Sequence, residues 1–172
     1  MKKWMALLLT GVMMFGCTGT AFAAETKVTV DGKPVVFTDA KPFVDENGRT
    51  MVPLRPVANA MGLDVEWNQQ FQTATFSESY TPGLEVLGVD GRMIYMAVVF
   101  TIGSSNVEGS GKVELYEGGI EPVFDSFSMD TTPVVKDGRT YAPLRYLAES
   151  FGYDVGWDNA TKTVTVKNYR MQ

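Results

Sequence analysis

One phrase is written twice in this chain of 172 residues. Residues 48–62 read GRTMVPLRPVANAMG, and residues 138–152 read GRTYAPLRYLAESFG. When residues 48–76 are aligned without a gap on residues 138–166, thirteen of the twenty-nine positions are identical. Identity of this kind indicates a tandem duplication of one supersecondary unit, and it constrains the fold more than any other feature of the sequence.

Each copy carries the signals of a short helix. Pro53 and Pro143 suit the first helical turn, where a missing N–H costs nothing. Gly62 and Gly152 stand where a left-handed C-terminal cap is expected. Between them, apolar residues recur at i, i+3, i+4 and i+7, which predicts one apolar face on each helix. These residues are Leu54, Val57, Ala58 and Met61 in the first copy and Leu144, Leu147, Ala148 and Phe151 in the second.

Strands are expected on both sides of each helix. Behind the helices, LDVEW with TATFS and YDVGW with TVTVK predict two hairpins, since TATFS and TVTVK alternate polar and apolar residues. Ahead of the first helix, KVTVDGKPVVF predicts a hairpin that turns at Asp31–Gly32. Its expected counterpart is KVELYEGGIEPVFD, which turns at Gly118–Gly119. The sequence therefore predicts an α+β fold: two hairpin, helix and hairpin units form a pseudo-symmetric pair, with mainly antiparallel sheet packed on two short helices.

The repeats occupy about 26–77 and 112–167, and an unrepeated connector lies at about 78–111. The connector offers two further strands that turn about Asp90–Gly91. They are followed by GSSNVEGSG, whose glycine and serine content predicts a flexible loop.

Residues 1–23 have the pattern of a secretory signal peptide: two lysines, an apolar run, and Ala-Phe-Ala at the end. The apolar run is too short for a membrane span, which needs roughly 20 residues. Cleavage after Ala23 is expected, which leaves residues 24–172 as one secreted or envelope-associated domain. In the alternative that we disfavour, Cys17 becomes the acylated first residue of a lipoprotein.

The chain contains no histidine, and without residues 1–23 it contains no cysteine. This composition excludes a Ser-His-Asp triad, a histidine-ligated metal site and a thiolate nucleophile. We expect no catalytic residue, metal or cofactor. The net charge is −5 for the whole chain and −7 without the two lysines of the signal peptide, which argues against nucleic acid as a partner.

The repeated motifs resemble a known family. VTVDGKPVVF, GRTMVPLRPVANAMGLDVEW and GRTYAPLRYLAESFGYDVGWDNATKTVTV are similar to the copper amine oxidase N-terminal domain-like family, also called the stalk domain, from about Thr26 to Lys167. The resemblance implies a peripheral, non-catalytic module of antiparallel sheet around a helix. In the amine oxidases, copper, the quinone cofactor and catalysis belong to a separate domain. Similar modules occur in secreted and envelope proteins of Gram-positive bacteria.

Arg55 and Arg145 admit two interpretations. A guanidinium on a first helical turn can bind a carboxylate or phosphate ligand. We favour a structural role in which each arginine holds its own unit together, because residues that are copied together are expected to meet within the unit. The expected partners are Asp64 and Asp154 by ion pairing, and Trp67 and Trp157 by stacking.

The tryptophans also admit two interpretations. Trp67 and Trp157 could act as sugar-stacking platforms, but we favour burial over the helices, because a tryptophan buries roughly 200 Å². Arg49 and Arg139 follow a turn glycine and are expected on the surface.

Four aromatic residues of the connector region form the candidate ligand surface, with burial at alternate core positions as the other interpretation. They are Tyr80, Tyr95, Phe100 and Tyr116. The leading functional hypothesis is a non-catalytic exported module for interaction or spacing at the bacterial cell envelope, with a wall polymer or an envelope protein as partner. The alternative is a carbohydrate- or peptidoglycan-binding module that uses these aromatics. A carboxylate-based hydrolase is the third hypothesis, and no acidic pair in the sequence marks it.

Overall fold

The computed structural model describes residues 25–79 and 91–168. Within these residues, thirteen strands and two short helices form three sheets, and every strand pairing but one is antiparallel. This confirms the α+β class and the mainly antiparallel sheet with two short helices. The predicted signal peptide, Cys17, Tyr80 and most of the turn about Asp90–Gly91 lie outside the described residues.

A small central sheet joins the two copies of the repeated phrase. In order, its strands are β10 (Val134–Lys136), β11 (Arg139–Pro143), β4 (Thr50–Pro53) and β3 (Phe43–Val44). Strands β4 and β11 are antiparallel neighbours, and Val52 lies directly opposite Ala142. These two residues occupy the same place in the two copies, ninety positions apart. The two copies therefore pair with each other at equivalent residues.

Each of these strands leads directly into a helix. Helix α1 (Leu54–Met61) follows β4, and helix α2 (Leu144–Ser150) follows β11. Pro53 and Pro143 are the N-cap residues, with ψ of 115° and 120°, so they end the strands and the helices begin one residue later than predicted. The fixed φ of proline is compatible with both helix and strand, but the extended ψ of Pro53 and Pro143 makes each of them the last residue of its strand.

The predicted helix faces and caps are confirmed. The residues of the two apolar stripes are buried, and together they form the centre of the core. Gly62 (φ 80°) and Gly152 (φ 71°) adopt the left-handed conformation that ends each helix. Neither helix has a side-chain cap, so the packing of its apolar face supplies most of its stability.

A second sheet brings the two ends of the described chain together. In order, its strands are β12 (Tyr153–Asp158), β13 (Thr163–Asn168), β1 (Lys27–Val30) and β2 (Lys33–Pro34). The predicted hairpin at Asp31–Gly32 is present as β1 and β2, and the predicted hairpin behind α2 is present as β12 and β13. Strand β1 also runs parallel to β13, with Val30 opposite Val166.

The third sheet is an antiparallel meander. Its strands follow chain order: β5 (Asp64–Asn68), β6 (Thr73–Ser79), β7 (Gly91–Thr101), β8 (Asn106–Leu115) and β9 (Ile120–Ser128). The predicted hairpin at Gly118–Gly119 is present as β8 and β9, but it lies in a different sheet from β1 and β2. The antiparallel pair directly ahead of α2 is instead β10 and β11.

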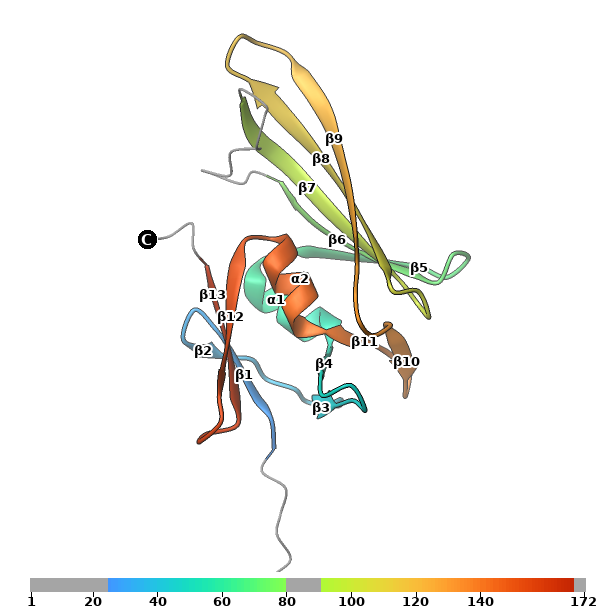
Figure 1. The fold of residues 1–172 in the computed structure, drawn as a ribbon, viewed down its shortest axis with the longest axis vertical. Coiled ribbons are helices and arrows are strands. Elements are labelled where there is room, and N and C mark those ends of the chain that lie inside the picture. The colour runs from blue at the N-terminus through green and yellow to red at the C-terminus, as the bar shows by residue number, and fades with distance from the viewer. Residues whose placement is uncertain (1–24, 80–90, 169–172) are drawn as a thin grey trace, which may run out of the picture.

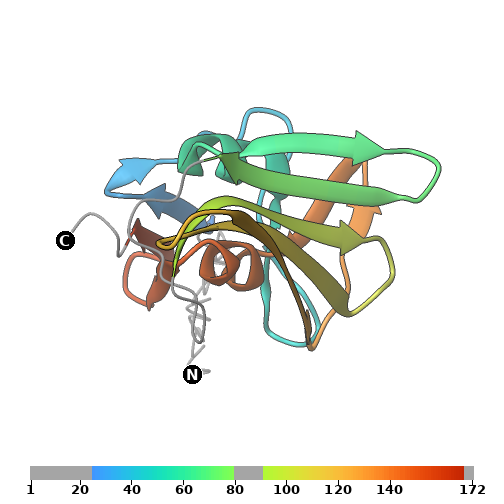
Figure 2. The ribbon, with the colours of Figure 1, turned by 90° about the horizontal axis from the view of Figure 1, so that it is seen from above.

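All three sheets share one hydrophobic core around the helices. Figure 1 shows α1 and α2 in the middle of the molecule, between the β12-β13-β1-β2 sheet and the meander. Figure 2 shows the meander strands side by side from above. One buried cluster contains residues from both of these sheets and from the end of α2: Phe76 and Phe100 of the meander, Val28 and Val166 of the second sheet, and Phe151. No helix within residues 25–79 or 91–168 is long and apolar enough to cross a membrane.

The prediction of a flexible loop at GSSNVEGSG is wrong for most of its length. From Asn106 onward this segment is the first half of β8, which is paired on both sides. Gly111 is buried opposite Met96, next to a register shift in β7 between Met93 and Tyr95. A Cβ at Gly111 would lie 2.9 Å from Met93 Sδ and 3.1 Å from the Tyr95 carbonyl oxygen. Glycine here allows close packing within a sheet rather than loop flexibility.

Replacing Gly111→Ala is expected to lower the free energy of unfolding by about 1–3 kcal/mol, because the added methyl group overpacks the β7–β8 pairing. Gly109→Ala is the matched control in the same strand, since its nearest contact would be an ordinary 3.6 Å. Urea unfolding monitored by circular dichroism measures both variants. Equal stability of the two variants would contradict the account.

Candidate functional site

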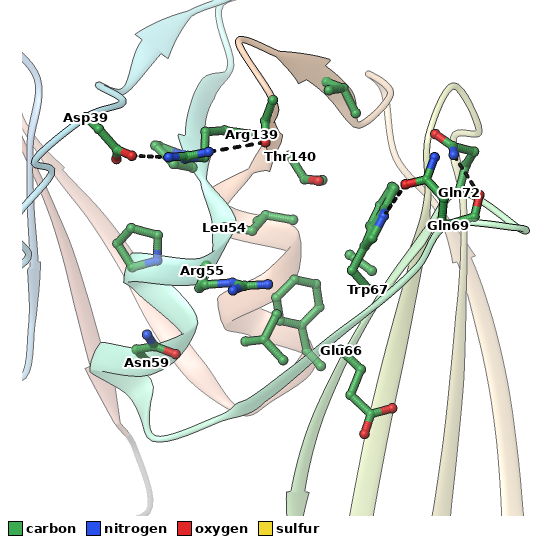
Figure 3. Close-up of a pocket in the computed structure, with 17 residues that line it drawn as sticks. Asp39, Leu54, Arg55, Asn59, Glu66, Trp67, Gln69, Gln72, Arg139 and Thr140 are labelled. Atoms are coloured by element: carbon green, nitrogen blue, oxygen red, sulfur yellow. Dashed lines mark hydrogen bonds and ion pairs between the residues drawn. The ribbon is translucent and has the colours of Figure 1, made fainter.

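A cleft of about 710 Å³ lies where three parts of the fold meet. Helix α1 forms one wall, the β5–β6 hairpin forms the opposite wall, and the turn between β10 and β11 closes one end. Figure 3 shows Arg55 and Leu54 on the helix side, with Trp67 across from them. The polar lining also includes Asn59, Gln69, Gln72 and Arg139.

Arg55 projects into this cleft rather than fastening its helix. It is exposed, and its guanidinium has no hydrogen bond, ion pair or ring contact with any described residue. The expected contact with Asp64 or Trp67 is therefore absent from this part of the chain. Arg55 follows the buried Leu54 by one position, which turns its side chain about 100° away from the apolar stripe and toward solvent.

Arg145, the equivalent residue of the second copy, has a different environment. Its Nη1 lies 3.4 Å from Glu149 Oε1, one helical turn further along α2, and both side chains are about half exposed. The expected pairing with Asp154 or stacking on Trp157 is not found. Exposed i, i+4 pairs contribute little, roughly 0.3–0.5 kcal/mol, so the apolar stripe and not the arginine holds α2 in place.

The two tryptophans differ as well. Trp67 is partly buried against the core, and its Nε1–H donates a 2.9 Å hydrogen bond to Gln69 Oε1. Trp157 is 47% exposed, with Lys162 Nζ 6.0 Å from its ring, so the prediction of burial is wrong for this residue. Along one face of β12, burial falls from Tyr153 to Val155 to Trp157, because the strand extends beyond the core. Trp67, in contrast to Trp157, lies in the wall of the cleft.

Three of the four connector aromatics lie within the described residues, and they differ in exposure. Phe100 is 0% exposed and packs edge-on against Phe76, with ring centroids 5.7 Å apart, so it is a core residue. Tyr95 is half-buried beside Lys112, whose Nζ lies 5.8 Å from its ring centroid. Tyr116 is 62% exposed near the β8–β9 turn. The alternation along β7 puts Phe100 on the core side, which the sequence alone did not resolve.

The interactions that sequence reasoning missed are two ion pairs that cross between the copies. Arg49 Nε donates to Asp130 Oδ2 at 2.7 Å, and Arg139 pairs with Asp39. Each repeated arginine thus reaches an aspartate that lies in the other copy, ahead of that copy's repeated phrase. The sequence did contain a signal for these ion pairs, since Gly-Arg-Thr occurs in both copies and an aspartate, Asp39 or Asp130, precedes it each time. Arg49 and Arg139 are exposed, as expected.

These contacts shift the pKa of both aspartates in the same direction. The hydrogen bond from Arg139 lowers the pKa of the Asp39 carboxyl, and the hydrogen bond from Arg49 lowers that of Asp130. The Tyr146 hydroxyl adds a 3.0 Å hydrogen bond to Asp130 Oδ1, with the same effect. Both carboxylates are therefore held in the charged form.

Asp39→Asn and Asp130→Asn are each expected to flatten the loss of stability in acid. A depressed folded-state pKa stabilises the fold above the unfolded-state value of about 3.9, and this contribution disappears as the pH falls through the folded-state pKa. Urea unfolding between about pH 7 and pH 2.5 measures the effect. Asp64→Asn is the control, because the Asp64 carboxylate has no ion pair among the described residues. Acid profiles identical to wild type for both variants would refute the role of the ion pairs.

Comparison with known proteins gives one match. No curated protein and no solved structure matches the chain. A family model described as the copper amine oxidase N-terminal domain matches residues 29–166, which includes both copies of the repeated phrase and the meander between them. The family predicted from the sequence motifs is confirmed. This chain belongs to the copper amine oxidase N-terminal domain family.

Proposed function

We propose that this protein is a non-catalytic exported module that mediates interaction or spacing at the bacterial cell envelope. The cleft beside α1 is the observation that carries the proposal, because one concave surface combines an indole, amide groups and a guanidinium that has no partner within residues 25–79 and 91–168. Such a lining is typical of a binding site. The N-terminal domain of copper amine oxidases is itself non-catalytic, which supports the same assignment.

The family name raises the question of copper, and the residues of this chain do not fit it. Protein copper sites rely on imidazole and thiolate or thioether ligands. The chain has no histidine, and within residues 25–79 and 91–168 no three side chains among His, Cys, Asp and Glu lie together so as to hold an ion. We assign no metal-dependent step to this protein.

Hydrolysis by carboxylates finds no support in the cleft. Its two acidic residues are Asp39, which is held by Arg139, and Glu66, whose carboxylate points away from the cavity (Figure 3). Glycoside hydrolysis needs two carboxyl groups that face one substrate.

We also propose that the two halves are copies of one hairpin, helix and hairpin unit related by a pseudo-twofold axis. The pairing of Val52 with Ala142 supports this, because a local twofold axis between β4 and β11 places equivalent residues opposite each other. The reciprocal ion pairs of Arg49 and Arg139 follow the same relation.

Export is tested by producing the whole chain in a Gram-positive host and fractionating the culture. The protein is expected in the envelope or the medium, because residues 1–23 have the signal-peptide pattern. Its intact mass, measured by mass spectrometry, is expected to be that of a chain that starts at Ala24. The mass of a lipid-modified chain that starts at Cys17 would show that the protein is anchored as a lipoprotein, and the envelope location would still hold. Uncleaved protein in the cytoplasm would contradict the proposal.

Carbohydrate or peptidoglycan binding is the second candidate function, and Trp67 at the cleft wall is the observation that favours it. The chain without residues 1–23 is expected to pellet with insoluble peptidoglycan sacculi over a salt series. Pelleting that survives high salt would support wall binding by the cleft. Pelleting that disappears with salt, or its absence, would favour spacing or a protein partner.

A further inference from the structure

Four ionisable side chains line the cleft, and only one of them leaves an unmatched charge facing it. Arg139 and Asp39 form an ion pair, and Glu66 points away (Figure 3). Arg55 remains without a partner among the described residues. A planar guanidinium in this position can hold a carboxylate through two parallel hydrogen bonds. The cleft is therefore suited to a ligand that carries a single negative charge.

The other surfaces of the cleft suit a ring. Trp67 lies across the cleft from Arg55 and Leu54, and its hydrogen bond to Gln69 fixes the indole against the hairpin (Figure 3). Gln72 Nε2 also donates to the Gln69 carbonyl oxygen at 2.8 Å, so the rim of this wall is ordered. A fixed aromatic side chain offers a flat apolar face to a ligand at low entropic cost.

Amide side chains complete the lining. Asn59, Gln69 and Gln72 each carry both donors and acceptors, which match the hydroxyl groups of a saccharide, since these also donate and accept. The volume of about 710 Å³ falls within the range of roughly 300–1,000 Å³ found for small-ligand sites. The cleft can thus accommodate a short oligosaccharide.

A comparison of the two copies shows why Arg55 and Arg145 differ in their pairing. Position 59 is asparagine, whereas the equivalent position of α2, ninety residues later, is Glu149. Glu149 forms an ion pair with Arg145, but Asn59 cannot neutralise Arg55 in this way. This single difference between the copies leaves one arginine occupied and the other available.

From these observations we infer that the cleft binds an acidic saccharide of the uronic acid class, with Arg55 bound to the carboxylate and Trp67 packed against the sugar ring. The inference rests on the proposed role as an interaction module and names the chemistry of its ligand. Phosphate in a glycerol phosphate polymer would satisfy the guanidinium equally well, but it has no ring to pack against Trp67.

The test uses the chain without residues 1–23 and with Trp157→Phe, which leaves Trp67 as its single tryptophan. Its fluorescence is followed during titration with galacturonic acid, which carries one carboxylate, with the neutral sugar galactose, and with glycerol phosphate. A saturable change with the acidic sugar, and at least tenfold weaker binding of the other two, is expected. Equal binding of the neutral sugar or of glycerol phosphate, or no saturable change with the acidic sugar, would overturn the inference.

Variants at the helix surface make the test specific. Arg55→Gln is expected to weaken binding of the acidic sugar at least tenfold, because it removes the guanidinium. Asn59→Glu is expected to weaken it about twofold, because an exposed i, i+4 pair like that of Arg145 with Glu149 would compete for Arg55. Arg145→Gln and Glu149→Asn are the matched controls and are expected to bind like the parent protein. All four positions are exposed or at the edge of their helices, so thermal unfolding should change little. Unchanged binding in Arg55→Gln would reject the assignment.

The two proposals fail in different experiments. Envelope localisation without binding of the acidic sugar would reject the ligand and leave the interaction module. Binding of the acidic sugar by a protein that stays in the cytoplasm would reject the envelope function and leave the cleft as a saccharide site.

Discussion

The rest of this structure depends on the antiparallel pairing of β4 with β11. The pairing places Val52 and Ala142 at the centre of the molecule, both with no exposed surface, and a helix leaves each strand at the next residues. Because the helices start from opposite ends of the same two-stranded ribbon, their apolar stripes meet in one core. Either copy alone would expose its stripe to water, which is why a duplicated unit this small is expected to fold as a pair.

Around this ribbon, the copies share a framework and differ in what they attach to it. Arg49 and Arg139 reach across to an aspartate ahead of the other copy, so the repeated charges connect the copies rather than close each one. The hairpin behind α1 continues into the five-stranded meander, while the hairpin behind α2 accepts β1 as a parallel neighbour. Helix α1 thus has a neighbouring wall with Trp67, whereas Trp157 lies near the solvent-exposed end of its strand.

Local patterns were sufficient for much of the fold. The helix stripes, Gly62, Gly152 and the hairpins at Asp31–Gly32 and Gly118–Gly119 depend on spacing and turn chemistry that neighbouring residues determine. The course of residues 106–111 depended on tertiary pairing, so sequence reasoning placed it wrongly. Sequence reasoning also missed the partner of Arg145, Glu149, although it lies only four residues further along the same helix. Glycines that permit close packing beside Met93 are indistinguishable in sequence from glycines of a flexible loop. The cleft is formed by segments that are distant in the chain, so no local sequence pattern predicts it.

The parallel pairing of β1 with β13 has a consequence for the order in which the protein forms. Thr29 donates a hydrogen bond to the carbonyl oxygen of Val164, 135 positions later in the chain. Because synthesis begins at the N-terminus, β1 emerges long before β13. The edge of β1 that pairs with β13 therefore stays unpaired until β13 has been synthesised. Closure of such a long loop carries a large entropic cost before any contact repays it, which favours slow, late completion of the sheet. A nascent chain of this protein cannot complete this sheet until residues 163–168 have been synthesised.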